Sequence, residues 1–348
     1  MPERVTIKQV AQQAGVSVAT VSAVIRGATN GNVRISAPTR ERVERVVDEL
    51  GYRPNFLARG LRNQKSQLLG FITDVVGQSL ATGAMLQGAQ DAASEAGIAL
   101  LLFTTGDDRQ IERRAIDIMH GHRVDGLIYG TMSHRVVEVP DGVRDLRTVL
   151  LDARAADGSL PSVEPDDERG GYEATRYLID AGHRRIAFVT TREPSRAADE
   201  RLAGHRRALS EAGIQADSAL IVSAENTLSV KMGEDAAAGL LALPALPTAI
   251  FAYNDPLAQG VYQAIHEAGL RVPHDVSVIG YDDQLHIAAA LEPGLTTMRL
   301  PHYEMGRWAV EHLLSRGADG SQPPAQIRME CPLVERASVA RREAPMGS

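Results

Sequence analysis

Residues 6–27 read TIKQVAQQAGVSVATVSAVIRG, and this stretch decides the fold of the N-terminal end of the chain. Apolar residues recur from Ile7 to Ala14 at the spacing of one helix face, and Thr6 precedes them as a helix N-cap. Gly15 is the residue type that commonly ends a helix. The pattern therefore predicts one short helix from residue 7, followed at once by a turn.

A second short helix is predicted directly after this turn, with Ser17 as its cap and Gly27 as its stop. Its inward face carries Val21, Val24 and Ile25, and its outward face carries Val18, Ala19, Ser22, Ala23 and Arg26. Outward side chains this small let a helix approach the edges of DNA bases. A two-helix unit of about 20 residues is typical of the helix-turn-helix, whose second helix enters the major groove. The alternative, a helical hairpin in a small bundle, stays open on this stretch alone.

The composition is that of a soluble globular chain of two or three domains, with 348 residues of which 44% are apolar and 23% charged. No run approaches the about 18 apolar residues of a membrane span, and the N-terminus lacks an apolar signal core. We therefore expect a cytoplasmic protein without a membrane partner. The single cysteine, Cys331, excludes an internal disulfide framework and is expected to be a packing residue.

Charge is divided unevenly along the chain. Residues 1–66 hold 11 Lys and Arg against 5 Asp and Glu, a net charge of +6, whereas the remainder holds 26 against 39, a net charge of −13. A basic segment joined to an acidic body indicates a polyanion-binding module attached to a part that does not bind polyanions.

The rest of the N-terminal segment predicts one more firm helix and one weak one. Ser36 can cap a helix that ends near Gly51. The following run, residues 54–63, carries Gly60 inside a helical pattern, which costs about 1 kcal/mol relative to alanine. We expect this run to order only on a partner.

From Leu68 onward, apolar runs of strand length alternate with amphipathic helices. Continuous apolar strands between helices are typical of parallel sheets covered on both faces, and the length of this region favours two doubly wound lobes. Ligands of such sheets bind outside the carboxyl ends of the strands. We expect Asp74, Asp152, Asn254 and Asp282 to lie at or just past such ends.

The ordered motifs VTIKQVAQQAGVSVATVS, ERVERVVDELGYRPN, GHRRIAFV, ERLAG, AYND, VSVIGYDD and LTTM resemble the lactose-repressor/galactose-repressor family of bacterial transcription regulators, over essentially the whole chain. The resemblance implies a helix-turn-helix headpiece with a hinge helix and a core like that of periplasmic sugar-binding proteins. It also implies a homodimer or tetramer on a pseudo-palindromic double-stranded DNA operator.

This likeness divides the chain into a headpiece with its hinge helix, an effector-binding core and a disordered tail. The headpiece spans 1–66 with the hinge at 54–63, the core spans 67–340, and the tail spans 341–348. Within the core, the expected N-lobe is 67–166 with 298–328, and the expected C-lobe is 167–297 with 329–340.

The resemblance places DNA contacts on the headpiece and the hinge, with Leu61 as an apolar wedge that kinks the minor groove. The expected contacts are Thr6, Ser17, Val18, Ala19, Thr20, Ser22, Ala23, Arg26, Asn30, Asn55, Ala58, Leu61 and Arg62. Ala23 and Arg26 stand where many members carry Arg and Asn, so the operator sequences of those members do not transfer to this chain.

The same resemblance assigns a ligand site between the two lobes of the core. Arg201 would clamp the ligand, Asp282 would accept its hydroxyls, and Asn254 would add a polar contact; Asp74, Ser79, Asp152 and Ser195 fall near other family pocket positions. Leu228 stands where relatives often place a stacking aromatic residue. Carboxylates and amides around a guanidinium suit a polyhydroxylated ligand such as a sugar or a derivative.

We therefore expect a nucleoid-associated transcriptional repressor, without cofactor, metal site or enzymatic activity. A metal site at His120, His122 and Asp125 lacks a further ordered ligand, so a solvated turn is the preferred interpretation. A solute-binding transport protein and a sugar-acting α/β enzyme are the two alternatives. The basic headpiece disfavours the first, and the absence of nucleophile and phosphate-binding motifs disfavours the second.

Overall fold

The computed structural model describes residues 5–25, 35–53, 66–75, 80–106, 108–315 and 324–342. The chain separates into two compact units, Met1–Ser66 and Gln67–Ser348. Each unit has a core of its own and is described by itself below.

The first unit is a three-helix headpiece. It consists of α1 (Ile7–Ala14), α2 (Val18–Ile25) and α3 (Ala37–Glu49), packed around a small apolar core in which Val10, Val21 and Val43 are fully buried. Thr6 and Gln9 form a reciprocal capping box that begins α1, and Gly15 ends it in the left-handed conformation. The predicted helix-turn-helix is confirmed.

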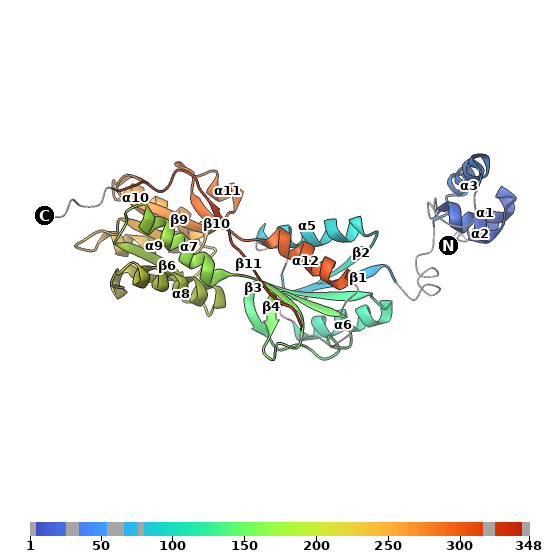
Figure 1. The fold of residues 1–348 in the computed structure, drawn as a ribbon, viewed down its shortest axis with the longest axis horizontal. Helices are drawn as coiled ribbons and strands as arrows, with labels where there is room; N and C mark the ends of the chain where they lie inside the picture. The colour runs from blue at the N-terminus through green and yellow to red at the C-terminus, as the bar shows by residue number, and fades with distance from the viewer. Residues whose placement is uncertain are drawn as a thin grey trace. The chain divides into compact units, whose positions relative to one another are not determined.

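The second unit contains two six-stranded sheets (Figure 1). The first sheet has the order β11 (Gln326–Met329), β5 (Ser162–Pro165), β4 (Thr148–Ala155), β3 (Gly126–Val137), β1 (Leu68–Thr73), β2 (Ala99–Thr104), and all its neighbouring strands are parallel. The second has the order β12 (Leu333–Val334), β10 (Thr296–Arg299), β9 (Ser277–Asp282), β8 (Ala249–Ala252), β6 (Ile186–Thr191), β7 (Ile221–Ala224) and is parallel except for the antiparallel pair β10 and β12. The expected doubly wound α/β core is confirmed.

Helices pack against both faces of the sheets, and the central strands β1, β6, β8 and β9 are buried along almost their whole length. We call the first sheet with α5 (Leu80–Glu95), α6 (Arg109–His122) and α12 (His302–Leu314) the first lobe. The second lobe is the second sheet with α7 (Asp167–Asp180), α8 (Arg196–Glu211), α9 (Val230–Leu241) and α10 (Asp255–Glu267). The short helices η1 (Ser218–Leu220) and α11 (Leu285–Ala288) complete it.

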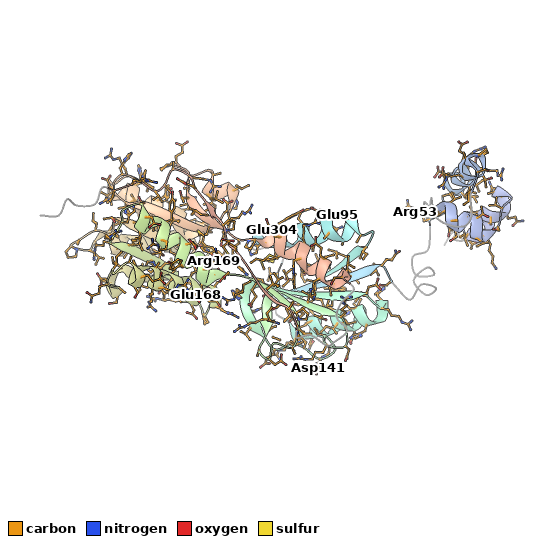
Figure 2. All side chains as sticks on the ribbon, viewed as in Figure 1. Arg53, Glu95, Asp141, Glu168, Arg169 and Glu304 are labelled. Carbon is orange, nitrogen blue, oxygen red and sulfur yellow. The ribbon has the colours of Figure 1, made fainter. Side chains whose placement is uncertain are left out.

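The chain passes between the lobes three times, from β5 to α7, from β10 to α12 and from β11 to β12. Figure 2 labels Glu168 and Arg169 in the first turn of α7, at the end of the second lobe nearest the first. Helices α7 and α8 approach closely there, because a Cβ atom at Gly204 would lie 2.0 Å from the carbonyl oxygen of Glu168. This contact sets the position of α8 beside the junction between the lobes.

Two local expectations differ from the structure. Asp152 lies inside β4 rather than at its end, because β3 continues past an irregularity and pairs with β4 as far as Val137 and Ala155. His120 and His122 lie in the last turn of α6 rather than in a solvated turn, and His120 Nε2 lies 2.8 Å from the carbonyl oxygen of Gly142. Cys331 is buried in the second lobe, as expected for a packing residue.

Along the described parts of the chain, no helix combines the length and the apolar character that crossing a membrane requires.

Candidate functional site

The outer face of α2 is the candidate DNA-reading surface. Val21 and Val24 are buried against α1 and α3, while Val18 is 42% exposed and Ala19 is also exposed. An exposed aliphatic side chain on a recognition helix can contact the methyl group of thymine. The face is therefore able to read base edges without any long side chain.

The hydroxyl groups of the headpiece candidates are engaged in local hydrogen bonds. Ser17 Oγ accepts from the backbone N–H of Thr20 at 3.1 Å, and Thr6 Oγ1 accepts from that of Gln9 at 3.4 Å. Ser22 and Ala23 are partly exposed. The candidates Arg26, Asn30, Asn55, Ala58, Leu61, Arg62 and, in the core, Ser79 lie outside the described residues.

Arg201 is the centre of the candidate ligand site in the core. Its side chain is 3% exposed, its Nε donates to Asp167 Oδ1 at 2.8 Å, and its Nη1 donates to the carbonyl oxygen of Tyr253 at 2.7 Å. The guanidinium carbon lies 3.6 Å from the ring centroid of Tyr281, a cation–π contact. The protein therefore already supplies partners for the guanidinium.

Asp282 approaches Arg201 at the end of β9, where Oδ1 lies 3.8 Å from Nη1. Its backbone is strained, with a φ of 109°. Burial raises the pKa of its carboxyl group to about 6, although Arg201 and the amide of Gln284 favour the ionised form. The buried carboxyl group therefore keeps its proton to a higher pH than an ordinary aspartate does.

Asp152 brings a buried carboxyl group from the first lobe. The residue is 4% exposed, its φ is 54°, and its Oδ1 has no hydrogen-bond partner. Burial is the main cause that raises the pKa of this carboxyl group to about 8, while His134 and Arg201 act in the opposite direction. An unpaired buried oxygen is costly unless another group bonds to it, so this atom marks a place for a hydrogen-bonding ligand.

Three further candidates stand on loops and helix starts of the second lobe. Asn254 caps α10, and its amide group donates to the carbonyl oxygen of Thr227 at 2.9 Å. Ser195 caps α8, and its hydroxyl lies 3.3 Å from that of Tyr253. Leu228 is 55% exposed. The side chains of Asn254 and Ser195 thus hold the loops that precede α10 and α8, and Leu228 exposes an aliphatic side chain.

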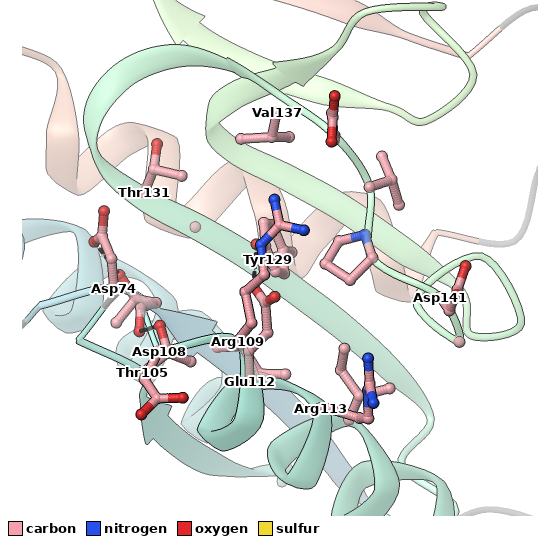
Figure 3. A pocket seen from close by; sticks show the side chains of 18 of the residues that line it. Asp74, Thr105, Asp108, Arg109, Glu112, Arg113, Tyr129, Thr131, Val137 and Asp141 are labelled. Carbon is pink, nitrogen blue, oxygen red and sulfur yellow. Dashed lines mark hydrogen bonds between the residues drawn. The ribbon is translucent and has the colours of Figure 1, made fainter.

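Asp74 lies apart from these residues, on an open cavity of about 950 Å³ in the first lobe (Figure 3). Its Oδ2 forms an ion pair with Arg135 Nη2 at 2.6 Å. The cavity is lined between Ile72 and Asp145, and none of the second-lobe candidates contributes to it. Arg201 and Asp282 therefore lie beside one another, the charge of Arg201 acts on the pKa of Asp152, and Asp74 lies on a first-lobe cavity that none of these three residues lines.

His134, Glu164 and Asp167 belong to the same buried junction, and sequence reasoning did not single them out. His134 Nδ1 lies 3.0 Å from Asp167 Oδ2, and its Nε2 lies 3.0 Å from Glu164 Oε1. The side chain of Asp167 is completely buried. In the sequence Asp167 stands in the acidic run 166–168 at the start of α7, a pattern that indicates a helix N-terminus and gives no sign of a buried partner.

Among the described residues, His134, Asp167 and Glu200 are close enough to share a metal ion. Asp167 already pairs with Arg201, and Glu200 Oε1 lies 2.7 Å from Nε of Arg196 and 2.7 Å from Nη2 of Arg328. Three guanidinium groups at these ligands oppose the binding of a cation, so the arrangement suits an ion-pair network better than a metal centre.

A helix-turn-helix headpiece joined to a two-lobed α/β core with a polar site at the junction defines a ligand-controlled DNA-binding regulator of transcription. Comparison with known proteins agrees: residues 6–55 match the description "Bacterial regulatory proteins, lacI family", and residues 175–339 match "Periplasmic binding protein-like domain". The chain belongs to the lacI family of bacterial regulatory proteins.

Individual relatives cover nearly the whole chain. The HTH-type transcriptional repressor PurR of Vibrio atlanticus is 33% identical over 96% of this chain and 98% of its own, and the ribose operon repressor of Escherichia coli K12 is 34% identical over 96% and 99%. Among solved structures, a lac repressor dimer bound to operator and the anti-inducer ONPF has a TM-score of 0.80 at 28% identity, covering 97% of this chain and all of its own. A complex of the regulator CelR with cellobiose has a TM-score of 0.66 at 30% identity, covering 96% and 100%.

Proposed function

We propose that this chain represses transcription as a homodimer on a pseudo-palindromic operator, and that a small polyhydroxylated molecule bound at the lobe junction controls it. The observation that carries the proposal is the pairing of Arg201 with Asp282 in the second lobe, together with a first-lobe carboxyl group, Asp152, on which the charge of Arg201 acts. A polyol can donate to the unpaired oxygen of Asp152 and accept from the guanidinium at the same time. Relatives named for ribose and cellobiose support a sugar or a derivative.

The mechanism follows from linkage between the site and the DNA. A ligand that touches both lobes changes their relative closure, and the N-terminal segment 54–63 transmits this change to the headpieces. The coupling is reciprocal and typically amounts to about 1–3 kcal/mol. Leu61, with Asn55, Ala58 and Arg62, would act on the minor groove at the operator centre.

The remaining assignments are parts of the same proposal. The predicted lobe limits, about 67–166 with 298–328 and about 167–297 with 329–340, shift by one or two residues, because Met298 and Arg299 belong to β10 of the second sheet and Met329 belongs to β11 of the first. Of the predicted tail, 341–348, Arg342 donates its backbone N–H to the carbonyl oxygen of Ala181, and residues 343–348 lie outside the described residues. The protein acts on nucleoid DNA in the cytoplasm, without catalysing a reaction, and a tetramer would pair two dimers. The names of two relatives, both repressors, support action on DNA without catalysis.

The test is a thermal-shift screen of the full chain against pentoses, hexoses, polyols and purine bases. A ligand at about 100 times its Kd stabilises the native state by about 2.7 kcal/mol. We expect a sugar or polyol to raise the melting temperature of the wild type, and Asp282→Asn to abolish that rise because Asp282 faces Arg201.

Asp283→Asn is the matched control, since the neighbouring carboxylate pairs with Arg336 at 2.6 Å instead. It should lower the melting temperature and keep the ligand response. Operator duplexes selected from a random pool then report the coupling, as the change in operator affinity on adding the ligand. A panel without any stabilising sugar or polyol, or an equal response in both variants, would contradict the proposal.

A further inference from the structure

His134 connects the two lobes through an unusually enclosed set of charges. It lies on β3 of the first lobe, within the irregularity between Gly130 and Arg135. Its side chain is 2% exposed and stands between two carboxylates, Glu164 on β5 and Asp167 at the start of α7. Glu164 belongs to the first sheet and Asp167 to the second lobe, so the imidazole spans the junction.

Asp167 continues this connection to the candidate ligand site. Its Oδ2 contacts His134, and its Oδ1 accepts from Arg201 Nε at 2.8 Å. One carboxylate of the second lobe is therefore shared by a first-lobe imidazole and by the guanidinium expected to clamp the ligand. A movement of the His134 imidazole therefore acts on Asp167, which is a direct hydrogen-bond partner of Arg201.

The other groups around His134 are mostly acidic. Asp152 on β4 interacts with it electrostatically, and Glu200 on α8 lies close enough to share an ion with His134 and Asp167. Two guanidinium groups contact these carboxylates: Arg196 on α8 lies 3.4 Å from Glu164, and Arg201 pairs with Asp167. The imidazole of His302, at the start of α12, is also buried, and Asp167 and Arg201 act on its pKa in opposite directions. Four carboxyl groups thus face one imidazole, and two guanidinium groups balance part of their charge.

Unpaired polar atoms gather at the same junction. In the described part of the chain, the buried atoms His134 Nε2, Asp152 Oδ1 and Glu200 Oε2 have no hydrogen-bond partner. Nε2 lies within ion-pair distance of Glu164, although its N–H is not aligned for a hydrogen bond. The imidazole is therefore held by charge on one side and by a hydrogen bond to Asp167 on the other.

We propose that His134 is a positioning residue of the ligand response, which in its protonated form holds Asp167 and thereby sets the position of Arg201. This inference rests on the proposed function of the junction as the ligand site. The carboxylates outweigh the effect of burial and raise the pKa of His134 to about 9. The contact is therefore complete below the ordinary value of 6.5, and it is lost as the pH rises through about 9.

The test observes the His134 imidazole and the Arg201 guanidinium by NMR. The sample is the ligand-free full chain, labelled with ¹⁵N at histidine and arginine. The His134 imidazole signals are assigned by their absence in His134→Gln, and the Arg201 Nε–H signal by its absence in Arg201→Lys. We expect His134 to titrate with a midpoint near 9, and the Arg201 signal to shift with the same midpoint. In His134→Gln the Arg201 signal should no longer shift with pH.

His266→Gln is the control, because His266 is exposed in the last turn of α10. It should leave both titrations unchanged. A purely structural His134 would lower stability without linking its own titration to the Arg201 signal.

A second measurement does not depend on the NMR assignments. The melting temperature of the wild type should exceed that of His134→Gln most near pH 6.5, and the difference should shrink toward pH 10. A His134 midpoint near 6.5, or an Arg201 signal that ignores the His134 titration, overturns the proposal. Neither readout needs a ligand, so a failed ligand screen would count against the proposed function alone.

Discussion

Asp167→Asn is the change that tests most directly how the buried junction is held together. Arg201 and His134 outweigh the effect of burial and lower the pKa of Asp167 from 3.8 to about 2. Because the folded-state pKa is lowered, the ionised carboxylate stabilises the protein above pH 3.8, and this stability is lost as the pH falls through about 2. At about 1.4 kcal/mol per unit, the charge contributes about 2–3 kcal/mol at pH 7.

The variant keeps the size of the side chain, removes its charge and replaces the oxygen that faces His134 by an amide N–H₂ group, which cannot accept a hydrogen bond. Its amide oxygen still accepts from Arg201, so the loss should lie near the charge contribution and below the about 3–5 kcal/mol of a fully broken buried pair. Urea unfolding at pH 7, followed by circular dichroism, measures this loss. The pKa of His134 should fall in the same variant, because the charge and hydrogen bond of Asp167 help to raise it.

Asp180→Asn is the matched control on the same helix. Asp180 pairs with Arg176 at 2.8 Å, but its side chain is 62% exposed. Exposed pairs are worth about 0–1 kcal/mol, so this variant should unfold close to the wild type. An equal loss in both variants would show that burial does not make the Asp167 contacts strong, and the reasoning above would be wrong.

Two further predictions concern helix packing and the DNA. Gly204→Ala should destabilise the core by about 1–3 kcal/mol or more, since its Cβ would meet the Glu168 carbonyl, whereas Gly239→Ala in α9, with open space around it, should not; thermal unfolding compares the two. Leu61→Ala should weaken operator binding by about 1–3 kcal/mol and leave binding to random duplexes nearly unchanged, as measured by paired binding curves at fixed salt. An equal loss on both duplexes would exclude the wedge.

Local patterns in the sequence were sufficient to predict the headpiece. The Thr6–Gln9 capping box and Gly15 act within one or two turns of helix, so neighbouring residues decide where α1 begins and ends. The alternation of apolar strands and helices predicted the two parallel sheets for the same reason. A strand buried on both faces carries a nearly continuous run of apolar residues, so it can be recognised without knowledge of its neighbours.

The junction could not be predicted in this way, because its contacts are long-range. His134 and Asp167 are 33 residues apart, and Asp167 and Arg201 are 34 residues apart. The acidic run 166–168 is typical of a helix start, and Asp166 caps α7 by accepting from Arg169 N–H. The next residue along turns inward to Arg201, and no local pattern distinguishes these two neighbouring aspartates.

The arrangement of partners at the junction also constrains how a ligand can act. A ligand shifts an equilibrium between two states only by binding them with different affinities. Arg201 already has Asp167 and the carbonyl oxygen of Tyr253, so a ligand that only replaces these partners gains little. Asp152 has an unpaired buried oxygen, and satisfying it removes a cost that the ligand-free protein bears. In the proposed function, the net free energy of binding therefore arises largely at the first-lobe carboxyl group, and a ligand gains most in the state that brings Asp152 and Arg201 within reach of one molecule.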